Sequence, residues 1–484
     1  MSAEVRALEP AIMWNHFADL NAVPRPSKKE ERVIAFAKKF GEDLGFPTHV
    51  DEVGNVIIKK PASPGMEDRK TIVLQSHLDM VHQKNAATNF DFDKEGIRMY
   101  VDGDWVRAEG TTLGADNGIG VASIMALLGS NDIPHPPIEA LFTIDEETGM
   151  TGAMGLKGGL LDGEILLNLD TEDDDELTIG CAGGIDVTAT GHYIEQHADD
   201  TRSWYKLTLN GLTGGHSGMD VHRGRANANK GINRVLAEIN DKVDLQIAKI
   251  DGGSLRNAIP RESFAVIGVH NDEALSKHVE ELQTLLQNEY RSTDPNLALQ
   301  LEKTEMPNKA LTNEFAKNFI RAIAVCPVGI WRMSPEIEGL VQTSNNLARV
   351  LVAAGHYSVQ CLTRSSVDSE KMDEANTIKA LFELIGGKVQ FGGSYPGWTP
   401  RPDADIVSVM SNLYKEMFKE DAHVMACHAG LECGILGTNY PDMEMISFGP
   451  NIRGAHSPDE CVQISSVQKY WALLLETLQR IPKA

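Results

Sequence analysis

Residues 139–149 read Glu139-Ala140-Leu141-Phe142-Thr143-Ile144-Asp145-Glu146-Glu147-Thr148-Gly149, a mostly apolar run that ends in three consecutive acids. The apolar part predicts a buried strand, which cannot carry that much charge into a core at low cost. Neighbouring carboxylates at a strand end point in different directions. Glu147 could therefore hold a cation while Glu146 faces the water that the cation activates. The alternative is a solvated acidic turn, because short motifs carry a real risk of false matches.

Composition limits the class of protein. The chain has 484 residues, of which 42% are apolar, enough for two or three domains with cores of their own. The formal net charge of -24 disfavours nucleic acid and anionic membrane surfaces as partners. No basic region near the N-terminus leads into an apolar segment, no run is long enough to cross a bilayer, and none of the six cysteines forms a Cys-x-x-Cys pair. We therefore expect a cytoplasmic protein with reduced thiols that acts on a small soluble substrate.

Polar side chains follow several predicted strands in the first 170 residues. Residues 71–74 form a short apolar run before His77 and Asp79, and residues 165–169 end at Asp170. A glycine-rich segment, 109–120, carries Asp116 into a predicted helix. These strand ends predict an α/β sheet whose site lies beyond the carboxyl ends of its strands.

The middle of the chain shows a different pattern of predicted strands and helices. From about Trp204, strands and helices alternate in two passes, which suggests a separate α/β domain built from two similar halves. Beyond residues 394–398, histidines and glutamates again follow predicted strands. We therefore predict a first domain formed by residues 1–186 and 391–484, interrupted by an inserted domain, residues 187–390. Near the N-terminus, Ser27 and Glu30 predict a capping box for the first long helix.

Five residues form a mixed set of nitrogen and oxygen donors: His77, Asp116, Glu147, Asp170 and His456. Two imidazoles and three carboxylates suit zinc, manganese or cobalt. One carboxylate could bridge two ions about 3.5–4 Å apart, which together hold a hydroxide and polarise a carbonyl. Asp79 is placed to orient the imidazole of His77. Any one of the five could be a hydrogen-bonded loop residue, but five at such positions indicate a metal site.

Five motifs also carry a family resemblance. They are His77-Leu78-Asp79, Gly114-Ala115-Asp116-Asn117-Gly118, Asp145-Glu146-Glu147-Thr148-Gly149, Asn168-Leu169-Asp170-Thr171-Glu172 and Gly454-Ala455-His456-Ser457. In order and spacing they resemble the co-catalytic metallopeptidases of family M20 over nearly the whole chain.

The resemblance implies a fold and a metal centre. It implies an α/β fold in which a two-zinc catalytic domain, a mixed sheet flanked by helices, is interrupted by an α/β lid domain, and cobalt or manganese could replace zinc. By position, His77 and Asp170 would hold one ion, Glu147 and His456 the other, and Asp116 both. Glu146 would be the general base, and Asp79 the outer-shell residue behind His77.

The inserted domain supplies candidates for substrate binding. His216 lies among glycines, Asn257 in a polar segment, and Arg364 in Thr363-Arg364-Ser365-Ser366. From the residues alone, His216 is an ordinary surface histidine and Arg364 a solvated arginine. The resemblance implies that His216 stabilises the oxyanion and that Asn257 and Arg364 bind substrate, with Arg364 on a C-terminal carboxylate. Glu432 is a further candidate, for the free ammonium group of the substrate.

The resemblance implies metal-dependent hydrolysis of dipeptides with a free N-terminus, including Xaa-His dipeptides such as β-alanyl-histidine. It also implies a homodimer, with the lid acting in its own subunit or across the interface. A deacylase or carboxypeptidase is the first rival, but such relatives commonly place Glu where this chain has Asp170. A binding protein on a retired peptidase fold is the second. Glu146 argues against it, because a binding protein needs no base.

Overall fold

The computed structural model describes residues 3–484 and divides into two compact units. Unit 1 extends to Gly180 and continues in Trp398–Ala426 and Leu431–Ala484, whereas unit 2 comprises Cys181–Gly397 and Cys427–Gly430. From the sequence we predicted domain boundaries after residues 186 and 390, and we did not predict that residues 427–430 belong to the inserted domain. Within residues 3–484, no helix combines the length and the apolar character needed to cross a membrane.

Unit 1 is built around an eight-stranded mixed sheet with the order β1-β2-β6-β3-β7-β23-β8-β22. The strands are β1 (Thr48–Val50), β2 (Val56–Lys60), β3 (Ile72–His77), β6 (Ile138–Thr143), β7 (Ile165–Asn168), β8 (Glu176–Cys181), β22 (His423–Cys427) and β23 (Glu444–Ser447). The central strands β6, β3, β7 and β23 run parallel, and β2 and β8 pair with them antiparallel. Both β3 and β6 are buried at every position, as expected of parallel strands covered on both faces. The carboxyl ends of the parallel strands therefore meet at one edge.

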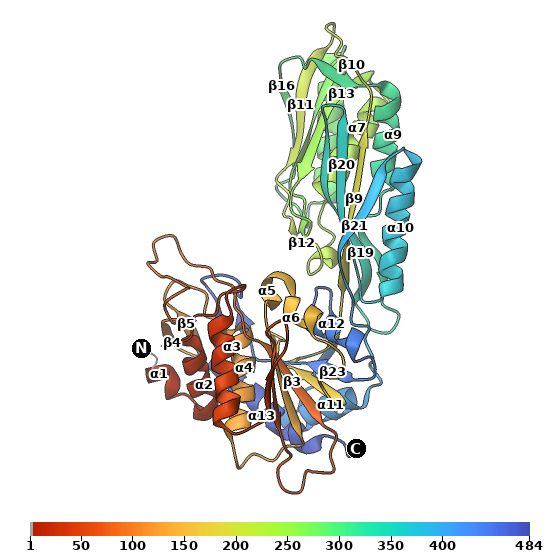
Figure 1. Cartoon of the computed structure of the whole chain (residues 1–484). Helices are drawn as coiled ribbons and strands as arrows, with labels where there is room; N and C mark the ends of the chain where they lie inside the picture. The colour runs from red at the N-terminus through yellow and green to blue at the C-terminus, as the bar shows by residue number, and fades with distance from the viewer. Residues whose placement is uncertain (1–2) are drawn as a thin grey trace. The chain divides into compact units, whose positions relative to one another are not determined.

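Helices surround this sheet (Figure 1): α1 (Ala3–Arg6), α2 (Ala11–Asn21), α3 (Glu31–Asp43), α4 (Ala115–Gly129), α5 (Glu146–Gly149), α6 (Thr151–Gly155), α11 (Asp405–Phe418), α12 (Glu432–Asn439) and α13 (Ile464–Arg480). Helix α4 is buried along most of its length, where it packs against β3 and α2. The expected capping box is wrong, since α3 begins at Glu31 with no side-chain cap. The hydroxyl of Ser27 donates instead to the buried carboxylate of Asp79 at 2.8 Å, which needs donors more than the helix end does.

A small sheet in unit 1 connects distant parts of the chain. Its order is β24 (Ile452–Arg453), β25 (Cys461–Gln463), β5 (Trp105–Ala108) and β4 (Met99–Asp102). The connection between β24 and β25 carries His456, and β5 leads into the glycine-rich segment that carries Asp116. Pairing of β25 with β5 thus brings the C-terminal motif to the N-terminal ones.

Unit 2 contains a nine-stranded sheet whose named pairings are all antiparallel. Its strands are β9 (Gly183–His192), β11 (Ser203–Asn210), β13 (Leu245–Gly253), β15 (Ser263–Val269), β16 (Ala298–Lys303), β18 (Gly329–Met333), β19 (Val341–Ala353), β20 (His356–Ser365) and β21 (Lys388–Tyr395). The helices are α7 (Ala228–Asn240), α8 (Asp272–Glu289), α9 (Asn313–Val325) and α10 (Asp368–Leu384). One apolar core, formed by the sheet and all four helices, fills the space between them.

This sheet contains two halves with the same topology, β-α-β-β-α-β. The first is β11-α7-β13-β15-α8-β16, and the second is β9-α9-β19-β20-α10-β21. Their sheet orders are β16-β11-β15-β13 and β21-β9-β20-β19, and β13 joins β19 in the middle. Two similar halves were expected. The structure adds that the whole first half is inserted between β9 and α9 of the second, in one continuous sheet (Figure 1).

Candidate functional site

The parallel strand ends of unit 1 carry the predicted metal ligands. His77 is the last residue of β3, Glu146 and Glu147 open α5 just after β6, and Asp170 follows β7. Asp116 stands in the first turn of α4, where its backbone is not helical. Because the parallel strands share one edge, segments far apart in sequence place their polar side chains together there.

The five predicted ligands lie in two groups that share Asp116. In one group, Nε2 of His77 lies 3.1 Å from Oδ1 of Asp116 and 3.5 Å from Oδ1 of Asp170. In the other, Nε2 of His456 lies 3.3 Å from Oδ2 of Asp116 and 2.9 Å from Oε2 of Glu147. Within each group the ligand atoms all lie within 4.8 Å of one another. The two oxygens of Asp116 therefore face different imidazoles, as a bridging carboxylate would.

The electrostatics of these groups show a shortage of positive charge. Burial lowers the pKa of His77, but the carboxylates of Asp170, Asp116 and Asp79 outweigh it and hold that pKa well above its usual range. Hydrogen bonds to Asp116 and Glu147 raise the pKa of His456 to about 11. Burial raises the pKa of Asp170 to about 6. Two buried oxygens, Oε1 of Glu147 and Oδ1 of Asp170, have no hydrogen-bond partner among the described residues. Divalent cations would supply both the charge and the missing partners.

Asp79 connects β3 to α5. Its carboxylate is fully buried and lies 3.4 Å from Nδ1 of His77. The same carboxylate accepts hydrogen bonds from the backbone N–H groups of Glu146 and Glu147, at 3.0 and 3.4 Å. One side chain thus orients an imidazole and fixes the N-terminus of the helix that carries both acids.

Glu146, the first residue of α5, stands among other carboxylates. Burial, followed by the neighbouring carboxylates of Asp170, Glu432 and Glu147, raises its pKa well above the usual range. A carboxyl with a raised pKa can take a proton near neutral pH and give it up again.

Glu432 begins α12 and is fully buried. Its Oε2 accepts hydrogen bonds from Gln75 and Thr143, both at 2.6 Å, and its Oε1 has no hydrogen-bond partner among residues 3–484. Burial raises its pKa to about 8. Gln75 and Thr143 lie on β3 and β6, so Glu432 belongs to the same strand edge as the ligands.

In unit 2, His216 has a defined tautomer. It lies in the short strand β12 (Gly215–His216), and its Nδ1 accepts hydrogen bonds from the backbone N–H groups of Gly218 and Met219, at 3.2 and 3.0 Å. A backbone N–H can only donate, so the proton of the neutral ring is on Nε2. Burial and the nearby charge of Arg364 lower the pKa of His216 and keep the ring neutral. Its Nε2–H is therefore a donor.

Arg364, on β20, is buried and lacks an acidic partner. No carboxylate of residues 3–484 lies within 4.0 Å of its guanidinium, and Nε has no hydrogen-bond partner among them. Within the described chain its side chain makes one hydrogen bond, from Nη1 to the hydroxyl of Tyr395, at 2.9 Å. Next to it, burial lowers the pKa of His428 to about 3, and Nε2 of that ring lies 2.7 Å from Oγ of Ser344. A buried guanidinium that has no acidic partner in the described chain, near two imidazoles whose pKa values are lowered, favours an anion.

Comparisons with known proteins now decide the family. A model described as peptidase family M20/M25/M40 matches residues 73–480. The chain belongs to this family. It is 43% identical over 482 residues to the cytosol non-specific dipeptidase of Escherichia coli (strain K12), across 99% of each chain.

Solved structures agree with this assignment. The aminoacylhistidine dipeptidase of Vibrio alginolyticus matches with a TM-score of 0.94 and 43% identity, over 100% of this chain and 99% of that one. A tripeptidase from Staphylococcus aureus matches with a TM-score of 0.55 and 15% identity, over 98% of this chain and 99% of that one, which shows a common fold alone. The resemblance to M20 metallopeptidases, and within them to dipeptidases, is confirmed, as are the α/β fold class and the assignment as a peptidase.

Asn257 lies in the same part of this M20 chain as His216. Its backbone carbonyl accepts a hydrogen bond from the backbone N–H of Ser217 at 2.8 Å, and the following residue, Ala258, pairs with His216 between β14 (Ala258–Ile259) and β12. The side chain of Asn257 is exposed. His216 and Asn257 come from the first half of unit 2, and Arg364 comes from the second.

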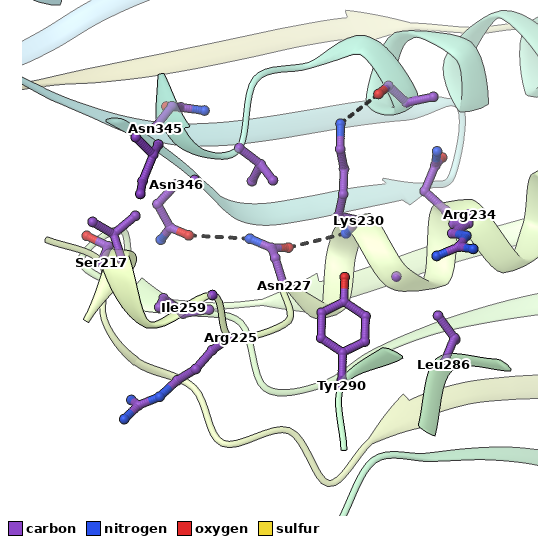
Figure 2. Close-up of a pocket in the computed structure, with 18 of the residues that line it drawn as sticks. Ser217, Arg225, Asn227, Lys230, Arg234, Ile259, Leu286, Tyr290, Asn345 and Asn346 are labelled. Atoms are coloured by element: carbon purple, nitrogen blue, oxygen red, sulfur yellow. Dashed lines mark hydrogen bonds between the residues drawn. The ribbon is translucent and has the colours of Figure 1, made fainter. Parts of the chain in front are cut away.

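A cavity of about 680 Å³ lies beside α7 in unit 2 (Figure 2). Its described lining includes Ser217 but not His216, Asn257 or Arg364. The amine of Lys230 donates to the carbonyls of Ile323, Ala324 and Cys326, and Arg234 forms an ion pair with Glu289. Arg234 thus has an acidic partner, unlike Arg364, and three carbonyls already accept from the amine of Lys230.

Two buried residues beside the site were missed in the sequence. Arg25 and Glu460 are both buried beside the segment that carries Asp116. A lone arginine between two prolines and a glutamate four residues after His456 match no metal-binding or catalytic motif. The placement of Arg25 between Pro24 and Pro26 was the only local signal.

Proposed function

We propose that this M20 peptidase hydrolyses unblocked dipeptides, including Xaa-His dipeptides such as β-alanyl-histidine, with two divalent metal ions per subunit. The observation that carries the proposal is the division of the Asp116 carboxylate between two groups of potential ligands. The similarity over the full chain to a cytosol non-specific dipeptidase and to an aminoacylhistidine dipeptidase supports the substrate class.

The donor set fits a pair of metal ions. Two imidazoles and three carboxylates suit zinc, with cobalt or manganese as substitutes. The orphaned oxygens of Glu147 and Asp170 and the excess of carboxylates favour cations at both positions. His77 and Asp170 would hold one ion, Glu147 and His456 the other, and Asp116 both. When bound, two such ions would acidify water and polarise the carbonyl of the scissile bond.

The residues around the ions have separate tasks. Glu146 takes a proton from the attacking water and later gives it to the leaving amine, which its raised pKa permits. Asp79 keeps His77 and the start of α5 in place. The Nε2–H of His216 donates to the carbonyl oxygen as negative charge develops there.

Recognition of both substrate ends would restrict the length of the peptide. Arg364 binds the C-terminal carboxylate with its fork of donors, and Asn257 assists from the neighbouring segment. Glu432 is assigned to the free ammonium group, since its second oxygen lacks a partner among the described residues. Dipeptides, tripeptides and N-acetylated dipeptides, assayed with added zinc, cobalt or manganese and with a chelator, test this. Efficient cleavage of tripeptides or of N-acetylated dipeptides, or full activity with chelator, would overturn the proposal.

We also propose a cytoplasmic homodimer whose partners are small peptides rather than nucleic acid or membranes. The net charge of -24 and the name of the E. coli relative support this. Unit 2 of one chain already contains His216, Asn257 and Arg364, so donation across an interface would supply them as a set.

Mixing Glu146→Gln subunits with His216→Ala subunits decides between the two arrangements. Recovery of activity would mean that sites are shared. No recovery, with subunit exchange verified independently, would mean that each chain completes its own site.

A further inference from the structure

The carboxylate of Glu460 binds four consecutive backbone N–H groups. Its Oε2 accepts from Leu113 and Gly114, at 2.7 and 2.9 Å, and its Oε1 accepts from Ala115 and Asp116, at 2.8 and 3.2 Å. The side chain is 3% exposed. No side-chain cation of residues 3–484 forms an ion pair with it, so these N–H groups are its main compensation.

A buried arginine donates to a backbone carbonyl of the same segment. Nη2 of Arg25 donates to the carbonyl of Gly114 at 2.5 Å. Its Nη1 donates to the carbonyls of Leu78 and Asp79, both at 3.1 Å, just after His77. One guanidinium thus joins the segment that carries His77 to the segment that carries Asp116.

Two glycines make room for this guanidinium. A Cβ atom at Gly114 would lie 2.6 Å from Nη2 of Arg25, and one at Gly118 would lie 2.7 Å from the same atom. Gly114 also has a φ of +70°, a conformation that favours glycine. The segment is therefore shaped to receive Arg25, whose charge lies among the carboxylates of Glu460, Asp79, Asp116 and Glu147.

We infer that Arg25 and Glu460 are positioning residues that hold the carboxylate of Asp116 between the imidazoles of His77 and His456. The inference rests on the proposed role of Asp116 as the shared ligand. Glu460 lies in the β24–β25 connection together with His456, and it binds the N–H groups of the segment that carries Asp116. Arg25 binds a carbonyl of that same segment and the carbonyls of the two residues that follow His77. A ligand fixed before the ions arrive loses less freedom on binding them.

The test measures metal binding rather than turnover. The full-length Glu460→Gln variant, stripped of metal, is titrated with Co²⁺ and followed by its visible absorption, with Zn²⁺ competition for the affinity. Glutamine keeps the size of the side chain but replaces one acceptor by a donor that faces two N–H groups. We expect Co²⁺ affinity to fall by about 10–100-fold, the usual effect of losing an outer-shell partner.

Asp459→Asn is the matched control. It makes the same charge change at the neighbouring, exposed position and should leave the Co²⁺ titration unchanged. Arg25→Lys is the second variant. It keeps the charge but cannot reach all three carbonyls, so we expect a similar loss of affinity and an altered cobalt spectrum.

The outcomes separate the inference from the proposed function. If the wild-type protein binds fewer than two ions, the two-metal proposal is wrong. If it binds two and a folded Glu460→Gln or Arg25→Lys variant binds them equally well, the positioning role is wrong. If Glu460→Gln does not fold, judged by circular dichroism, Arg25→Lys decides. Failure of both to fold would also overturn the inference and leave these residues a role in folding alone.

Discussion

The strand edge of unit 1 carries an excess of negative charge, whereas the group formed by Arg364, His216 and His428 in unit 2 carries an excess of positive charge. In unit 1, four carboxylates, those of Asp79, Asp116, Glu147 and Asp170, lie around two imidazoles whose pKa values they raise. In unit 2, a buried guanidinium without an acidic partner in the described chain lies near two imidazoles whose pKa values are lowered. Under the proposed function, histidine has two uses: as a ligand for cations in unit 1 and as a neutral donor in unit 2. The proposal gives each group a ligand of opposite charge: metal ions in unit 1 and a carboxylate in unit 2.

The largest expected effect separates two neighbouring acids of unit 1. Glu146→Gln should lower turnover by roughly 10²–10⁴-fold, because it removes a base, while metal content persists. Glu147→Gln should lower metal occupancy, because it removes a ligand. Turnover and metal content are measured on both variants. Loss of metal in the first and its retention in the second would mean that the two roles are exchanged.

His216→Ala should lower turnover by roughly 10²–10³-fold with metal content unchanged, because it removes one donor to the developing negative charge. His222→Ala provides a control. It removes an exposed histidine six residues along the chain and should keep wild-type turnover. An equal loss in both variants would mean that the effect arises from the loop rather than from the Nε2–H group.

Arg364→Lys tests the preference of unit 2 for an anion. The charge remains but the planar fork is lost, so we expect kcat/KM for dipeptides to fall by roughly 10–100-fold, mainly through KM. Dipeptide amides, which lack the C-terminal carboxylate, should be poor substrates of both proteins and nearly insensitive to the change. A similar loss for the amides would remove Arg364 from carboxylate recognition.

The last expected effect is on stability rather than turnover and concerns Glu374, a buried acid of unit 2 away from Arg364 and the metal ligands. Neither of its oxygens has a hydrogen-bond partner among the described residues, and burial raises its pKa from 4.5 to about 9. Between about pH 4.5 and about pH 9, Glu374 therefore keeps its proton in the folded chain but has lost it in the unfolded chain. The stabilisation is full below about pH 4.5 and is lost as pH rises towards about 9.

Glu374→Gln should remove this dependence, because glutamine is neutral at every pH. Thermal unfolding of both proteins at pH 5 and pH 8.5 is the measurement. The wild-type Tm should fall more between these values, by about 2–4 °C for each kcal/mol lost. Glu383→Gln, at an exposed position of the same helix, should behave as wild type. Parallel pH curves for Glu374→Gln and wild type would mean that Glu374 is ionised in the folded protein.

The sequence predicted what depends on local pattern. Apolar runs that end in His77, Glu147 and Asp170 identified strands and their shared edge, because charged groups at the end of a buried strand need a compensating partner there. Arg25 and Glu460 were missed because they bind backbone carbonyl and N–H groups. Almost every residue has these groups, so no pattern of side chains marks the contact. The capping box failed because Ser27 bonds Asp79, which lies 52 positions further along the chain.

Unit 2 shows the same limit on a larger scale. The alternation of strands and helices indicated two halves, but not that β9 pairs with β20 and β21, which follow only after α9. Such pairings depend on contacts between residues far apart in sequence, which local patterns do not record.

The insertion of one half of unit 2 into the other leaves the two ends of the inserted half close together. Its two ends are neighbours, since β10 (Glu195–His197) pairs with β17 (Lys309–Leu311) and Ala198 N donates to the carbonyl of Asn308 at 3.4 Å. A chain closed directly from residue 198 to residue 308 would keep every strand of the second half but uncover the edge of β19 at residues 349–352, which β13 occupies. Unpaired edges of this kind recruit other strands. The shortened protein should therefore assemble through β19, using a second molecule where the natural chain uses its own insertion.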